Sequence, residues 1–172
     1  MTTTIKELNS VDIAAVGDLV SRIQDDPATA GTVWKSTVDW KRGFRSEARS
    51  RDFAPVPSDE PHSLGGEDTA ANPVEQLLGA LGNCLAVGYA ANATAAGIEL
   101  DDLRIELEGS LDLHTFLGLK DGNAGFETIH ARVSIDSDAT DEQLDELHRR
   151  VVATSPVGHT LQREVPVTVD LS

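Results

Sequence analysis

The feature that most constrains the fold is a long apolar segment, rich in small residues, that begins at Asn72-Pro73 and ends before Gly97. Asparagine is a favoured N-cap residue, proline is favoured at the first helical position, and glycine commonly follows the end of a helix. The segment therefore predicts a helix of about six turns. Because glycine and alanine let another backbone approach closely, we expect this helix to be central and buried.

Alternation of apolar and polar residues predicts five strands around this helix. They cover residues 33–40, 44–48, 103–107, 129–135 and 165–171. A turn at Arg42-Gly43 joins the first two strands into a hairpin, and Pro166 favours a sheet edge for the last one. Hairpins combined with helices indicate an α+β fold, with a mainly antiparallel sheet packed on the central helix and on a second helix.

Two further helices and one long loop complete the predicted organisation. Apolar residues at helical spacing predict a helix between Ser10, as its cap, and Pro27. Thr140 and Gln143 form a capping-box pattern at the start of the second helix, which Pro156 must end. The segment 49–71 is rich in proline, serine and glycine, and loops of this length are usually functional or mobile.

The charge of the chain limits its partners. Its 29 acidic and 14 basic residues give a formal charge of −15. Phosphate backbones and anionic membranes would be repelled, so we expect neither nucleic acid nor a membrane as a partner. The single cysteine excludes an internal disulfide, and neither a signal segment nor a membrane-spanning run is visible. We therefore expect a cytoplasmic protein.

Motifs for metals and cofactors are missing from the sequence. None of the five histidines stands at metal-ligand spacing, and no second cysteine accompanies them. The sequence also contains no P-loop, no dinucleotide fingerprint and no G-x-S-x-G. We therefore expect no metal and no cofactor.

The one cysteine, Cys84, lies in the middle of the predicted central helix. Burial among apolar side chains disfavours the thiolate, and about three turns from the helix start the macrodipole contributes almost nothing. A reactive thiol at this place would need a cation or a hydrogen-bond donor from elsewhere in the fold. From the residues alone, Cys84 is either an inert space-filling side chain or a reactive thiol.

Two segments taken together resemble the OsmC/Ohr family. They are N-P-V-E-Q-L-L-G-A-L-G-N-C-L at residues 72–85 and S-P-V-G-H-T-L at residues 155–161. The similarity runs from Val33 to the C-terminus, which divides the chain into an N-terminal helical extension, 1–32, and an OsmC-like domain, 33–172. The resemblance implies an intertwined α+β homodimer with active sites formed between the subunits.

The resemblance also assigns roles to individual residues. It implies that Cys84 is the thiol that attacks a peroxide and that Pro73 opens its helix. The second, resolving cysteine of the family falls on Ser155, whose hydroxyl cannot form a disulfide. The family's glutamate commonly follows the proline directly, whereas this chain has Val74 there. Glu75 comes next, but at about 100° per residue it lies on the opposite side of the helix from Cys84.

A basic residue of the N-terminal hairpin supports the thiolate in the family that the chain resembles. Arg45 is the preferred candidate here, and Arg42 and Arg49 are alternatives, because the register of the hairpin cannot be fixed from the sequence.

Two functions are compatible with these residues. One is a one-cysteine peroxidase, in which Cys84, with Arg45 and Ser155 beside it, reduces organic hydroperoxides and an external thiol restores it. The other is a non-catalytic, stress-associated protein that binds a small apolar molecule. Its ligand would lie in a dimer-interface pocket lined by Leu77, Leu81, Cys84 and Phe126. A different thiol or acyl reaction at Cys84 is a weaker third possibility.

Overall fold

The computed structural model describes residues 8–171, which fall into two compact units. One unit contains the residues up to Ile13 and from Leu78 onward, and the other runs from Ala14 to Leu77. The strands are β1 (Thr37–Arg42), β2 (Arg45–Arg49), β3 (Val56–Ser58), β4 (Asp102–Ser110) and β5 (Thr128–Asp136). The α-helices are α1 (Ile13–Asp25), α2 (Pro73–Ala95), α3 (Leu113–Phe116), α4 (Asp141–Thr154) and α5 (Pro156–Leu161).

The predicted long helix is confirmed as α2, although only part of it is buried and Val87 is 70% exposed. Its ends are set by local chemistry. The Asn72 carboxamide oxygen accepts the Glu75 N–H at 2.9 Å, and the Asn72 N–H donates to the Glu75 carboxylate at 2.8 Å. Two N–H groups at the helix start are thereby satisfied. At the other end Gly97 adopts a φ of 73°, a left-handed conformation that glycine reaches without strain.

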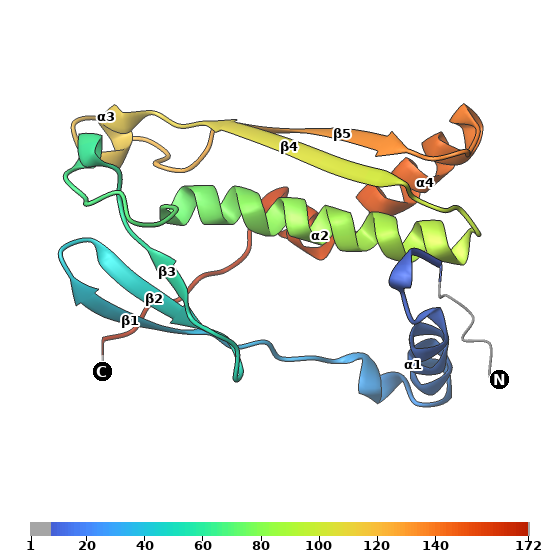
Figure 1. Cartoon of the computed structure of the whole chain (residues 1–172). Helices are drawn as coiled ribbons and strands as arrows, with labels where there is room; N and C mark the ends of the chain where they lie inside the picture. The colour runs from blue at the N-terminus through green and yellow to red at the C-terminus, as the bar shows by residue number, and fades with distance from the viewer. Residues whose placement is uncertain (1–7, 172) are drawn as a thin grey trace. The chain divides into compact units, whose positions relative to one another are not determined.

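The core of the larger unit lies between α2, α4 and the β4–β5 sheet, and Figure 1 shows both strands running alongside α2. The strands pair antiparallel, and their apolar residues on one face pack against the helices. Gly82 leaves room for this approach, because a Cβ there would lie 2.8 Å from the Leu107 Cδ1 atom and that side chain would have to shift. The buried apolar residues are Leu81, Leu85, Tyr89, Ala93, Ile98, Leu147 and Val151.

The second predicted helix is confirmed as α4, and its start has the expected capping box. The Thr140 hydroxyl accepts the Gln143 N–H, and the Gln143 side chain accepts the Thr140 N–H. The helix ends at Thr154, and Ser155 is its C-cap residue. Pro156 does more than end α4, because it occupies the first position of the short helix α5.

In the unit from Ala14 to Leu77 the predicted hairpin is present as β1 and β2, with a left-handed turn at Gly43. The loop predicted over 49–71 is not wholly irregular, because β3 pairs antiparallel with β2 and a 3-10 turn forms at His62–Leu64. A three-residue strand is too short to show alternation. The two sheets, β1-β2-β3 and β4-β5, give the α+β fold with antiparallel sheets that the sequence predicts.

Asp59 anchors the segment that follows β3. Its side chain is 1% exposed and accepts hydrogen bonds from the Thr69 hydroxyl, the Thr69 N–H and the Glu60 N–H. Burial pushes the pKa of Asp59 upward, but these hydrogen bonds outweigh it and hold the pKa below its ordinary value of 3.8. The carboxylate therefore fixes the loop in its ionised form.

Two predictions about the ends of the chain are wrong. Helix α1 begins at Ile13, because Ser10 has a φ of 56° and so cannot take the extended conformation of an N-cap. The strand predicted over 165–171 is irregular backbone. Alternation alone cannot make a strand where no neighbouring strand supplies hydrogen bonds, and Pro166 also removes one donor.

Asn9 is hydrogen-bonded to residues at and just after the end of α2. Its side-chain NH2 group donates to the Ile98 carbonyl at 2.9 Å and to the Thr94 hydroxyl at 3.1 Å, and its side-chain oxygen accepts the Leu100 N–H at 2.8 Å. Residues 1–7 and 172 lie outside the described range. The predicted segments 1–32 and 33–172 are therefore described only from residue 8 and only up to residue 171. No helix in the described range is long and apolar enough to span a bilayer.

Candidate functional site

The thiol of Cys84 lies in the middle of α2 and is half-buried. Leu81 and Leu85, which are buried in the core, precede and follow it on the same helix. The rigid packing of these neighbours fixes the direction in which the sulfur points. Cys84 is therefore neither sealed in the core nor fully in solvent.

Ser155 contacts this thiol directly. Its Oγ lies 3.3 Å from the Cys84 Sγ, although the two residues are 71 positions apart in the sequence. Ser155 stands between α4 and α5, where it ends one helix and caps the next, and only 5% of it is exposed. Cys84 and Ser155, two of the three predicted catalytic residues, are therefore in hydrogen-bond contact.

The hydrogen bonds of Ser155 give its hydroxyl a direction. The Gly158 N–H can only donate, and it does so to the Ser155 Oγ at 3.1 Å. When Cys84 is a thiolate its sulfur can only accept, so the Ser155 O–H must then point at the Sγ. Hydrogen bonds joined in this way polarise one another, and the N–H at the start of α5 strengthens the donor offered to the sulfur.

Gly158 is the residue that makes this arrangement possible. A Cβ at position 158 would lie 3.0 Å from the Ser155 Oγ and 3.2 Å from the Ser155 Cβ. These approaches are tighter than most Cβ contacts, so a side chain at position 158 would push Ser155 by a few tenths of an ångström. No sequence pattern points to Gly158 itself, although a serine followed by proline is a visible sign of a capped helix start.

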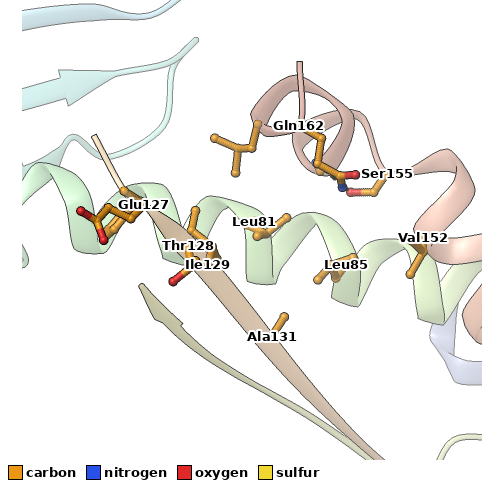
Figure 2. Close-up of a pocket in the computed structure, with 12 residues that line it drawn as sticks. Leu81, Leu85, Glu127, Thr128, Ile129, Ala131, Val152, Ser155 and Gln162 are labelled. Atoms are coloured by element: carbon orange, nitrogen blue, oxygen red, sulfur yellow. Dashed lines mark hydrogen bonds between the residues drawn. The ribbon is translucent and has the colours of Figure 1, made fainter. Parts of the chain in front are cut away.

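An apolar pocket of about 360 Å³ adjoins Ser155 (Figure 2). Its walls come from α2, from β5 with the residues before it, and from the α4–α5 region. The lining residues are Leu81, Leu85, Phe126, Glu127, Thr128, Ile129, Ala131, Val152, Ser155, Gly158, Leu161 and Gln162. Of the residues predicted to line a pocket at a dimer interface, Leu81 and Phe126 line this pocket of the single chain, whereas Leu77 and Cys84 are not among the described residues that form it.

The helical geometry of α2 explains why Cys84 is not in the lining. Leu81 and Leu85 are four positions apart and so share one face, which the pocket uses. Cys84 is one residue before Leu85 and points about 100° away from it. Ser155 therefore lines the pocket and is also hydrogen-bonded to the Cys84 Sγ.

Arg45 belongs to the other unit, where it is the first residue of β2. Its guanidinium lies 3.6 Å from the Glu67 carboxylate, which also pairs with Arg42 at 3.6 Å. Arg49 pairs instead with Asp39 and Glu47. All three candidate arginines therefore carry a carboxylate partner within their own unit.

Glu75 does not replace the glutamate that the family pattern places at Val74. Its carboxylate accepts the Asn72 N–H in the capping box of α2. A carboxylate used in this way stabilises the helix start and its dipole. The sequence-based conclusion that Glu75 cannot take over the missing role agrees with this contact.

A second polar contact ties α2 to α4. The Tyr89 hydroxyl, which is fully buried, is hydrogen-bonded to the His148 Nδ1, and the two rings stack with centroids 6.1 Å apart. Burial raises the pKa of Tyr89, so the phenol stays protonated at neutral pH. The pair holds the helix that carries Cys84 against the helix that leads to Ser155. No cluster of metal-ligating side chains occurs in residues 8–171.

Residues 65–170 match the sequence profile of the family described as OsmC-like protein, which is more than half of the chain and includes Cys84 and Ser155. No curated protein matches the chain.

Solved structures share the fold. An OsmC-like protein from Mycoplasma pneumoniae is 22% identical, with a TM-score of 0.66 over 76% of this chain and 88% of that chain. An organic hydroperoxide resistance protein OsmC from Legionella pneumophila is 17% identical, with a TM-score of 0.59 over 77% and 92%. An organic hydroperoxide resistance protein from Elizabethkingia anophelis, with thiocyanate bound, is 16% identical, with a TM-score of 0.58 over 76% and 90%.

Identities this low establish a common fold and leave the chemistry to be argued from the site. The fold, the profile match and the position of Cys84 on the central helix agree with the resemblance found in the sequence. The chain belongs to the OsmC-like protein family.

Proposed function

We propose that the protein is a one-cysteine peroxidase that reduces organic hydroperoxides and protects against oxidative stress. The observation that carries the proposal is the 3.3 Å contact between the Cys84 Sγ and the Ser155 Oγ. The contact puts a hydroxyl group within hydrogen-bond distance of the one thiol of the chain, and some structural neighbours are named organic hydroperoxide resistance proteins. A thiolate held by a directed donor is the nucleophile that such a reaction needs.

The first step is an attack of the Cys84 thiolate on the distal oxygen of the hydroperoxide. A sulfur–oxygen bond forms, the oxygen–oxygen bond breaks, and the alkoxide leaves with a proton as an alcohol. Two electrons pass from sulfur to the peroxide, and Cys84 becomes a sulfenic acid. The Ser155 O–H donates to the sulfur while it is negatively charged.

The second step requires a thiol from outside the chain, because Cys84 is the only cysteine. The first external thiol attacks the sulfenic acid, releases water and forms a mixed disulfide. A second thiol attacks that disulfide, which restores the Cys84 thiol and releases the oxidised reductant. A reducing compartment such as the cytoplasm would supply these thiols.

Arg45 is proposed as the cation that supports the thiolate. Within its own unit it shares Glu67 with Arg42 at 3.6 Å, and both arginines are substantially exposed. Exposed ion pairs of this length contribute little free energy, so a guanidinium can exchange one anionic partner for another at small cost. Arg42 and Arg49 remain the alternative candidates.

A homodimer is part of the proposal. Several large apolar side chains are strongly exposed in the single chain, among them Trp34 at 81%, Trp40 at 72% and Val87 at 70%. Exposed residues of this size are a common sign of an interface with another chain.

A peroxidase assay tests the proposed function. The protein is mixed with cumene hydroperoxide and dithiothreitol, and loss of the hydroperoxide is followed with the wild type, Cys84→Ser and a matched surface control, Ser134→Ala. The wild type and the control should turn over, whereas Cys84→Ser should not. Equal consumption by Cys84→Ser and the wild type would rule out the role of Cys84.

The pocket beside Ser155 favours a second candidate, a non-catalytic protein that binds a small apolar molecule. Its volume of about 360 Å³ lies within the range of about 300–1,000 Å³ that is common for ligand sites, and Cys84 does not line it. A ligand retained in native mass spectra, together with Cys84→Ser protein that behaves like the wild type, would favour this candidate. Peroxide-dependent turnover would exclude it.

A further inference from the structure

His159 stands on α5, four residues after Ser155, and has no part in the chemistry described so far. Its side chain is exposed, and its Nε2 lies 3.0 Å from the carbonyl oxygen of Ala153, in the last turn of α4. A carbonyl oxygen can only accept a hydrogen bond, so the His159 Nε2 must carry a proton and be the donor. The imidazole therefore joins α5 to the end of α4.

The hydrogen bond is made where a helix end leaves backbone groups without a helical partner. The last four carbonyls of an α-helix have no N–H group one turn ahead within the same helix, and Ala153 supplies one of them. Helix α4 ends at Thr154 and α5 begins at Pro156, so Ser155 alone separates the two helices. The contact of His159 with Ala153 therefore spans the junction at which Ser155 lies.

The position of the Ser155 hydroxyl depends on how α5 is held. Its Oγ accepts the Gly158 N–H at 3.1 Å, and Figure 2 shows Ser155 where α4 passes into α5. A helix of six residues is too short to be stable by itself, so α5 needs contacts with the rest of the chain. These include the packing of Val157 against the core and the hydrogen bond from His159 to Ala153.

We propose that His159 is a positioning residue of the peroxidase site, which holds the junction of α4 and α5 so that the Ser155 hydroxyl reaches the Cys84 sulfur. This inference rests on the proposed function and adds a residue to its site. Hydrogen bonds weaken steeply as their angle and length depart from the optimum, so a shift of α5 would weaken the 3.3 Å contact between Ser155 and Cys84. His159 acts as an N–H donor, and a positive charge on its ring is not required.

The first test measures this alignment and needs no peroxide. Ser155→Cys places a second thiol beside Cys84, and the equilibrium between their disulfide and the two free thiols is measured in a glutathione redox buffer. Adding His159→Leu, which removes the donor, should shift this equilibrium towards the free thiols by up to about fivefold, the equivalent of one typical hydrogen bond. Adding His159→Gln should leave the equilibrium unchanged, because its amide N–H stands as many bonds from the Cα as the imidazole Nε2 does.

The second test uses the native hydroxyl and follows the oxidation of Cys84 by cumene hydroperoxide in a single turnover. His159→Leu should slow this oxidation by up to about fivefold. In a Ser155→Ala background the same substitution should have no effect, because the hydroxyl that it positions is gone. Equal slowing in both backgrounds would show that His159 acts on the fold in general, and it would overturn the inference.

A matched control makes both tests specific. His130→Leu makes the same substitution at an exposed position of β5 and should change neither the disulfide equilibrium nor the rate. If His130→Leu has the same effect as His159→Leu, or if His159→Gln is as impaired as His159→Leu, the role given to the His159 donor is wrong. A Ser155→Cys protein that forms no disulfide would also overturn the inference, because the alignment would then not exist.

The two tests separate this inference from the proposed function. Oxidation of Cys84 no faster than that of free cysteine would end the peroxidase proposal, and the disulfide equilibrium would still decide whether His159 holds Ser155 in place. Rapid oxidation of Cys84 together with an unchanged equilibrium in His159→Leu would overturn the inference and leave the peroxidase standing.

Discussion

Replacing Ser155 by cysteine should convert the site into one that closes a disulfide. The Ser155 Oγ lies 3.3 Å from the Cys84 Sγ, and a disulfide bond is about 2.0 Å long, so the two sulfurs would need to approach by little more than 1 Å. With 71 residues of separation, the loss of chain entropy in the unfolded state corresponds to a stabilisation of about 4 kcal/mol, reduced by any strain in the bond.

The assay adds one equivalent of cumene hydroperoxide to Ser155→Cys and counts free thiols and intact mass. We expect both thiols to disappear together with no gain of a second chain in the denatured mass, which indicates a bond within one chain. The free energy of unfolding in urea should rise by up to about 4 kcal/mol relative to the reduced variant. Ser134→Cys, which introduces a thiol on an exposed position of β5, should form no internal bond. If Cys84 is oxidised in Ser155→Cys and the second thiol stays free, the inferred alignment of these two side chains is wrong.

The remaining predictions concern the surroundings of the site and the stability of the fold. Gly158→Ala should displace the Ser155 hydroxyl, slow the oxidation of Cys84 and cost about 1–3 kcal/mol, as measured by single-turnover mass spectrometry and by urea unfolding. Leu147→Ala, at a core position that is 2% exposed, should cost about 2–5 kcal/mol in the same unfolding assay. Because folding lowers the pKa of Asp59 below 3.8, its ionised form stabilises the fold above that pH, and this stabilisation is lost as the pH falls through the folded value. Asp59→Asn should therefore flatten the stability profile in acid, and an unchanged profile would contradict the role given to this carboxylate.

The parts of the fold that local chemistry determines could be predicted from the sequence. Asn72 and Pro73 mark the start of α2, and the Thr140–Gln143 pair marks the start of α4, because capping depends on residues only a few positions apart. The segment 165–171 shows the limit of that approach. Its alternation is that of a strand, yet a strand exists only where a second strand supplies hydrogen bonds, and that is a property of the tertiary structure.

Some residues of the candidate site could likewise be predicted from the sequence, and others could not. Cys84 could be singled out as the one thiol, and its pairing with Ser155 followed from a family resemblance and not from any local pattern. Gly158 could not be identified in this way, because its role comes from a contact with Ser155 that only the folded chain creates. A serine-proline pair does indicate a capped helix, so the start of α5 at Pro156 could have been predicted from the residues.

The most direct test of the central claim is the second-order rate constant for oxidation of Cys84 by cumene hydroperoxide, followed by intact mass in a single turnover. A thiolate held by the Ser155 hydroxyl and a guanidinium should react at least about a hundredfold faster than free cysteine at the same pH, a barrier lower by about 2.7 kcal/mol. A rate constant equal to that of free cysteine would show that Cys84 is an ordinary thiol and that the peroxidase proposal is wrong.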